Sequence, residues 1–323
     1  MVKIKIIHVK PILSDREVEE LEGTVLPNNY YKTILKEDAD VYKEDGTLLL
    51  KYRKGVLPQK NIISAYKNMI EHARKLTTTR GMTGGNTGKK KLVIYNNKIA
   101  SNIMGYFDTL SLQQKYIFRL AKMEKPLCRE ASFNQRNPEK WKKIIPLIKD
   151  IDRQYKKLFP KHHKIQLKEA QKTPFVIDDT AFTTITTNLN LQTACHYDKG
   201  DFSKGFGNLV VIEKGKYKGG YTGFPKYGIA VDVRTGDFLG MDVHLIHGNT
   251  PIIKLDKDAE RLSLVSYLRE NIPKKCANIK FRGRDYFEKA MLKARIAKSK
   301  MKTKKKKTSN KKKSFKNKKG YFF

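Results

Sequence analysis

Three residues in the second half of the chain have side chains and spacing suited to metal chemistry. His196 and Asp198 lie two positions apart, and His247 follows about fifty residues later. One carboxylate and two imidazoles can form the facial triad that binds non-heme Fe(II) and leaves positions open for a co-substrate and oxygen. Arg261 comes shortly after the second histidine, where its guanidinium could hold the far carboxylate of such a co-substrate.

The short spacing between the first two candidate ligands fits an extended backbone. Residues i and i+2 of a strand project to the same side, so His196 and Asp198 can reach one ion. His244 is the alternative second imidazole. We favour His247 because it lies at a predicted strand end, just before the turn Asn249–Pro251.

Polar residues occur on one face of a predicted strand that follows, over residues 262–269. Arg261 and Ser263 share this face with apolar residues, while leucines occupy the other face. An arginine and a serine pointing into a core are costly unless they bind an anion, so the pattern favours a carboxylate ligand. The structural alternative is a buried ion pair between Arg261 and Asp232 or Asp237.

The charge of the chain predicts a polyanionic partner. There are 68 Lys and Arg against 32 Asp and Glu. Residues 293–319 hold fifteen of these basic residues and no acid, which leaves 53 basic against 32 acidic residues in the rest. Such an excess attracts the phosphates of nucleic acid, either DNA or RNA, unless it reflects a general lysine bias. We find no signal peptide and no apolar run of membrane-spanning length, so we expect no membrane association and a nuclear or cytoplasmic location.

The apolar pattern changes along the chain from mixed to strand-like. Helices are predicted over 61–76, 111–123 and 137–158, after short strands in residues 1–60. From residue 181 the period becomes two, and short strands follow. Their predicted ranges are 181–191, 209–213, 220–224, 229–233, 238–243 and 262–269. We therefore predict an α+β protein with three parts: a mainly helical N-terminal support over 1–170, a β core over 171–290, and a disordered Lys-rich tail over 293–323.

An ordered set of motifs across residues 175–272 is more specific than any single one. The motifs are Ala181–Thr187, His196-Tyr-Asp198, Gly219-Gly220 leading to Phe224–Gly228, Gly236-Asp237, Leu245–Ile252 and Arg261–Tyr267. This segment resembles the Fe(II)/2-oxoglutarate dioxygenases, in the branch that contains the TET methylcytosine dioxygenases and the base J-binding thymine hydroxylases.

The resemblance implies a fold, a cofactor set and a reaction. The fold would be a double-stranded β-helix, or jelly roll. His196, Asp198 and His247 would bind Fe(II), and Arg261 with Ser263 would bind the distal carboxylate of 2-oxoglutarate. With O2, such an enzyme decarboxylates 2-oxoglutarate to succinate and hydroxylates the methyl group of 5-methylcytosine or thymine in DNA, on a base turned out of the duplex.

Four further residues are candidate substrate contacts. Asn188, Asn190 and Asp201 lie near the predicted ligands, and Arg80 lies in a Gly/Thr-rich loop that could contact nucleic acid. Three scattered cysteines cannot supply the Cys-rich zinc-binding region of TET proteins, so the resemblance does not fix which base is oxidised. A compact, virus-encoded member of the family is one expectation. The alternatives are the same chemistry on RNA or on protein side chains, and a nucleic-acid-binding jelly roll without catalysis.

Overall fold

The computed structural model describes residues 4–77 and 98–318, with side chains up to residue 303 in the last helix. By its internal contacts the chain divides into two compact units. The first contains residues 1–107 and 130–279, and the second contains residues 108–129 and 280–323. The boundary predicted near residue 170 falls inside the first unit.

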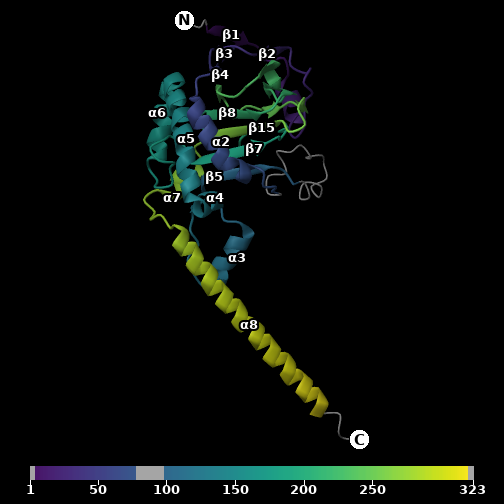
Figure 1. Cartoon of the computed structure of the whole chain (residues 1–323), viewed down its shortest axis with the longest axis vertical. Coiled ribbons are helices and arrows are strands. Elements are labelled where there is room, and N and C mark those ends of the chain that lie inside the picture. Colours follow the sequence, from purple (N-terminus) through teal and green to yellow (C-terminus); the bar gives the residue numbers. More distant parts are fainter. Residues whose placement is uncertain (1–3, 78–97, 319–323) are drawn as a thin grey trace. The chain divides into compact units, whose positions relative to one another are not determined.

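Among the described residues, the first unit contains three sheets. Figure 1 labels several of their strands, among them β8, β15 and β7. The largest has nine strands, in the order β1 (Lys5–Val9), β3 (Ala39–Lys43), β4 (Leu48–Arg53), β12 (Phe238–Met241), β8 (Gly207–Lys214), β15 (Glu260–Tyr267), β7 (Thr184–Leu189), β5 (Ser101–Phe107) and β6 (Arg129–Glu130). The second has four strands, in the order β13 (Gly248–Asn249), β10 (Thr222–Phe224), β11 (Ile229–Val231) and β2 (Thr33–Leu35). The third pairs β14 (Ile252–Lys254) with β9 (Tyr217–Gly219).

Strand β8 shows how the large sheet is buried on both faces. Leu209 and Val211 pack in a core cluster with residues of the four-stranded sheet. Val210 and Ile212 point the other way and pack in a second cluster, shared with helices. Since successive side chains alternate between the two faces, a central strand covered on both sides needs the near-continuous apolar run that β8 has.

Helices cover the outer face of the nine-stranded sheet. They are α2 (Gln59–Ala73), α4 (Ser132–Arg136), α5 (Pro138–Leu158) and α6 (Pro160–Ala170). On α5, Ile144, Ile148, Ile151 and Tyr155 recur at helical spacing and are fully buried against the sheet. This apolar stripe fixes α5 on the sheet, because each such side chain contributes about 1.5–3 kcal/mol when it leaves water.

The N-terminal half contributes strands as well as helices. Strands β1, β3, β4 and β5 extend the nine-stranded sheet, and β2 pairs in parallel with β11. A local sequence pattern identifies short strands but does not show their partners, because these pairings join residues far apart in the chain. The predicted α+β class is confirmed, and the predicted helical support shares its sheets with the core.

The second unit contains α3 (Leu112–Ala121) and α8 (Arg284–Lys318). Ser111 caps α3 through a capping box with Gln114, as its position predicts. Phe118 packs against Phe287 of α8, at 5.3 Å between ring centroids. The sequence predicts disorder from residue 293, whereas the structure continues α8 to Lys318. The segment is rich in Lys and has no glycine or proline, and this composition permits a helix.

The remaining helical elements are α1 (Asp15–Glu20), α7 (Asn271–Cys276) and the 3-10 turn η3 (Pro225–Tyr227). Among the described residues, no helix is both long enough and apolar enough to cross a membrane.

Candidate metal and co-substrate site

His196 and His247 meet through their backbones. They form an isolated antiparallel bridge, with His196 in the loop after β7 and His247 just before β13. A Cβ on Gly248 would lie 3.0 Å from the backbone nitrogen of Cys195 and 3.0 Å from the carbonyl oxygen of Thr193. Glycine at position 248 therefore lets the two ligand-bearing segments approach closely.

Backbone carbonyls set the orientation of both imidazoles. Nδ1 of His196 lies 2.7 Å from the carbonyl oxygen of Ala194, and Nδ1 of His247 lies 2.9 Å from that of Leu245. A carbonyl can only accept, so both Nδ1 atoms donate and both Nε2 atoms are directed toward Asp198. Nε2 of His196 is 3.3 Å from Oδ1 of Asp198, and Nε2 of His247 is 3.7 Å from Oδ2.

The three side chains converge on one point. One ligand atom from each of His196, Asp198 and His247 lies within 4.8 Å of the other two. Two imidazole nitrogens and one carboxylate oxygen are the donor set of a facial Fe(II) triad. The ring of His244, the alternative imidazole, instead contacts the carbonyl oxygen of Phe202 at 3.2 Å.

The carboxyl group of Asp198 is held in its ionised form. Burial raises its pKa, but hydrogen bonds and positive charge from His196 and His247 outweigh burial and hold the pKa well below the usual value. The site therefore offers a divalent cation an anionic oxygen beside two imidazoles.

Arg261 is buried, and no described residue forms an ion pair with it. Its side chain is 1% exposed, and neither Nε nor Nη2 has a hydrogen-bond partner among the described residues. The carboxylates considered as structural partners are occupied elsewhere. Oδ1 of Asp232 accepts from Nε of Arg234 at 2.6 Å, and Oδ2 of Asp237 accepts from the Tyr52 hydroxyl at 2.6 Å.

An uncompensated buried guanidinium is costly, so its donors require an anion. Burial lowers the pKa of Arg261, which is the expected response of a cation removed from water. A Cβ on Gly220 would lie 2.9 Å from Cδ of Arg261, and the φ angle of Gly220 is +68°. Glycine thus makes room for the arginine, and the two unpaired N–H groups fit a carboxylate ligand.

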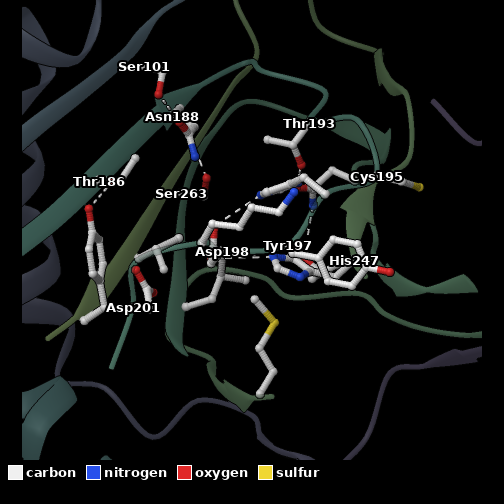
Figure 2. Close-up of a pocket in the computed structure, with 18 of the residues that line it drawn as sticks. Ser101, Thr186, Asn188, Thr193, Cys195, Tyr197, Asp198, Asp201, His247 and Ser263 are labelled. Atoms are coloured by element: carbon white, nitrogen blue, oxygen red, sulfur yellow. Dashed lines mark hydrogen bonds and ion pairs between the residues drawn. The ribbon is translucent and has the colours of Figure 1, made fainter. Parts of the chain in front are cut away.

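A cavity of about 710 Å³ contains the triad (Figure 2). Its walls come from α1, β5, β7, β8, β10, β12, β13, β15 and the loop after β7. Its lining includes polar and charged side chains suited to hydrogen bonding with a ligand: Ser101, Thr186, Asn188, Thr193, Asp201, Thr222, Asn249, Ser263, Tyr267 and Arg269. Arg261 does not line the cavity, but it lies on the same face of β15 as Ser263, near the start of the strand.

The predicted substrate contacts separate into two groups. Asn188 and Asp201 line the cavity, and Oδ1 of Asn188 accepts from the Ser101 hydroxyl at 2.7 Å. Asn190 does not line it, because its Oδ1 accepts from the backbone N–H of Arg261 at 2.8 Å and its φ is +49°. The geometry thus gives Asn190 a turn-forming position, whose backbone contact supports the start of β15.

The remaining predicted contact, Arg80, lies outside the described residues. Several further residues of the cavity wall were not identified from the sequence. The hydroxyls of Thr186 and Tyr267 lie 3.2 Å apart in the cavity wall, and the Arg269 guanidinium stacks 4.2 Å from the ring of Phe107. Thr186 and Tyr267 could have been found, because period two places them on the faces of Asn188 and Ser263. Glu19 of α1 and Ser101 of β5 could not, since only tertiary structure brings them to the site.

Comparisons with known proteins agree with this geometry. Residues 117–270 match the model of the Tet_JBP family, the oxygenase domain of the 2OGFeDO superfamily. The chain is 36% identical over 172 residues to the bifunctional helicase and thymine dioxygenase JBP2 of Leishmania tarentolae, covering 53% of this chain and 15% of that protein. It is 35% identical over 172 residues to thymine dioxygenase JBP1 of Trypanosoma brucei brucei, covering 52% and 19%. The chain thus spans less than a fifth of the length of these relatives.

The fold is also that of a solved structure. NgTET1 in complex with 5mC DNA superimposes with a TM-score of 0.51 at 13% identity, over 84% of this chain and 96% of that one. The predicted double-stranded β-helix core is thereby confirmed. The family match includes all three candidate metal ligands and Arg261, and it identifies residues 117–270 as a Tet_JBP oxygenase domain of the 2OGFeDO superfamily.

Proposed function

We propose that this chain is an Fe(II)/2-oxoglutarate dioxygenase that hydroxylates the methyl group of a pyrimidine base, 5-methylcytosine or thymine, in DNA. The observation that carries the proposal is the pairing of the His196–Asp198–His247 group with the buried, unpaired guanidinium of Arg261. A metal alone would explain the group but not the arginine. The JBP relatives, which are thymine dioxygenases, and the NgTET1 complex with 5mC DNA support the choice of substrate.

Each part of the site has a role in this proposal. His196, Asp198 and His247 would hold Fe(II), and Arg261 with Ser263 would hold the distal carboxylate of 2-oxoglutarate. Bound iron and 2-oxoglutarate supply, with O2, the oxidation that converts a methyl group to hydroxymethyl and releases succinate and carbon dioxide. The chain supplies fixed geometry: backbone carbonyls lock both imidazoles, and Asp198 stays anionic.

The cavity supports a flipped base as the substrate. A methyl group inside a duplex cannot reach a buried site, so the nucleotide must leave the stack. The cavity volume of about 710 Å³ is in the range of ligand pockets, and Asn188 and Asp201 in its wall can bond to the polar edge of a base. The formal charge of +36 favours contact with the phosphates. A DNA substrate implies action in the nucleus or cytoplasm.

The test uses purified protein with Fe(II), 2-oxoglutarate and ascorbate. Separate reactions receive duplex DNA with 5-methylcytosine, duplex DNA with thymine as its only methylated base, single-stranded DNA, and RNA. Nucleosides are identified by mass spectrometry, and succinate is measured in parallel. We expect a hydroxymethylated pyrimidine with matching succinate from one DNA substrate.

The matched control is the His196→Ala, Asp198→Ala double variant. If succinate from the unmodified protein never exceeds that of this variant, the enzyme assignment fails. Succinate without a modified base would retain the dioxygenase and exclude nucleic acid as its substrate. Modification confined to RNA would identify RNA, rather than DNA, as the substrate.

A further inference from the structure

Tyr217 is a buried tyrosine with an unused hydroxyl. It is the first residue of β9, its side chain is 6% exposed, and its hydroxyl has no hydrogen-bond partner among the described residues. Burial raises its pKa to about 12, so the hydroxyl keeps its proton at neutral pH and can donate. Buried tyrosine hydroxyls normally have a partner, so a missing partner indicates a ligand or another absent group.

The ring of Tyr217 is held in place from one side. The guanidinium of Arg234 lies 4.4 Å from the ring centroid, in stacking range. Arg234 is itself fixed by ion pairs to Glu213 at 2.9 Å and to Asp232 at 2.6 Å. Both nearby carboxylates are therefore already engaged by Arg234, and neither accepts from the Tyr217 hydroxyl.

Tyr217 and Arg261 belong to one neighbourhood. Chain geometry joins them, because Gly220 lies three residues after Tyr217 and packs directly on the side chain of Arg261. Their charges also interact: after burial, Arg261 has the largest effect on the pKa of Tyr217, which it lowers. This part of the structure therefore holds three buried donor atoms without a hydrogen-bond partner among the described residues, namely Nε and Nη2 of Arg261 and the hydroxyl of Tyr217.

We propose that Tyr217 is a second binding residue for the distal carboxylate of 2-oxoglutarate, beside Arg261. The inference rests on the proposed function, and it names a contact that the motif Arg261-x-Ser263 does not include. A carboxylate has two oxygens with about four acceptor positions. The Nε and Nη2 edge of a guanidinium can donate to both oxygens, and the tyrosine hydroxyl adds a third hydrogen bond.

The experiment measures co-substrate binding rather than turnover. Calorimetry on Mn(II)-loaded protein compares 2-oxoglutarate with 2-oxovalerate, in which a methyl group replaces the distal carboxylate. In Tyr217→Phe we expect Kd for 2-oxoglutarate to rise about tenfold or more, because a hydrogen bond to a charged group is lost. Kd for 2-oxovalerate should stay within about twofold of its value in the unmodified protein.

A second measurement separates binding from folding. The Tyr217 hydroxyl has no hydrogen-bond partner within the described ranges, so Tyr217→Phe should leave the thermal midpoint of the metal-free protein unchanged or raise it. The matched control is Tyr155→Phe, whose hydroxyl lies 3.1 Å from Oε1 of Gln166 and accepts from the Phe206 N–H at 3.2 Å. We expect this control to lower the midpoint and to bind 2-oxoglutarate normally.

Three outcomes would overturn the inference. They are an unchanged 2-oxoglutarate affinity in Tyr217→Phe, an equal loss for both ligands, and a loss of stability as large as that of Tyr155→Phe. If the unmodified protein itself does not bind 2-oxoglutarate, the proposed function fails and this inference fails with it. If the unmodified protein binds 2-oxoglutarate and Tyr217→Phe binds it equally well, only the role of Tyr217 is lost.

Discussion

The backbones of His196 and His247 exchange two hydrogen bonds, with each N–H donating to the other carbonyl, at 2.9 and 3.0 Å. Their ring centroids lie 4.6 Å apart. The two imidazoles are therefore positioned by backbone pairing and by their own Nδ1 contacts, before any ion binds. Such preorganisation lowers the conformational entropy that the protein loses when the metal binds.

Asp198→Ala should greatly weaken metal binding without unfolding the protein. The substitution removes the only carboxylate of the triad, and we expect the affinity for Mn(II) or Fe(II) to fall at least about a hundredfold. Calorimetric titration measures the affinity, and circular dichroism checks the fold. Asp201→Ala is the matched control, because Asp201 lines the same cavity but lies outside the triad. An equal loss of affinity in both variants would contradict the assignment of Asp198 as the ligand.

Arg261→Met should stabilise the protein while removing its co-substrate affinity. The buried guanidinium has no counter-ion in the part of the chain that the structure describes, so a side chain of similar volume without charge should raise the free energy of unfolding by about 1 kcal/mol or more. Urea unfolding and 2-oxoglutarate titration measure the two effects. Arg234→Met should act in the opposite direction on stability, since it breaks two ion pairs. A destabilised Arg261→Met would indicate that the guanidinium has a structural partner.

Glu260→Gln should weaken the attachment of α2 to β15 in a pH-dependent way. Oε2 of Glu260 accepts from the Tyr66 hydroxyl at 2.7 Å, and Oε1 pairs with Nη2 of Arg74 at 2.8 Å. Burial raises the pKa of Glu260, but these two contacts outweigh it and lower the pKa below the ordinary value. At pH 7 we expect the variant to lose about 1 kcal/mol of unfolding free energy.

The sign of the pH dependence follows from the lowered pKa. A depressed carboxyl pKa stabilises the fold above the ordinary value of 4.5, and this stabilisation disappears as the pH falls through the folded-state pKa. The difference between the unmodified protein and Glu260→Gln should therefore be full at pH 7 and shrink below about pH 4.5. Urea unfolding across this range measures it, and a difference that grows toward acid would contradict the mechanism.

Removing residues 304–323 should weaken DNA binding by reducing its electrostatic part. The segment holds ten lysines and no acid, and the aromatic cluster between α3 and α8 lies before it. We expect a shallower dependence of log K on log salt for a long duplex, with turnover on short oligonucleotides retained. A full-length variant with these lysines changed to glutamine separates charge from length. Unchanged binding in both variants would remove the tail from the DNA interface.

The sequence by itself determined the chemistry-bearing residues and the class of fold. His196-x-Asp198 and Arg261-x-Ser263 are readable because residues two apart on an extended chain share a side. The alternation in β15 likewise predicted that Ser263 faces inward, and Ser263 lines the cavity. These features depend on local backbone geometry, which the chain encodes over a few residues.

Only the tertiary structure decided which residues meet across long separations. It placed His247 rather than His244 beside Asp198, and engaged Asp232 and Asp237 elsewhere, so that Arg261 is left without a carboxylate. It also brought Gly220 to Arg261, and Ser101 of β5 to Asn188. Strand pairing and burial create these contacts. Their energies depend on partners distant in sequence, so no local pattern can specify them.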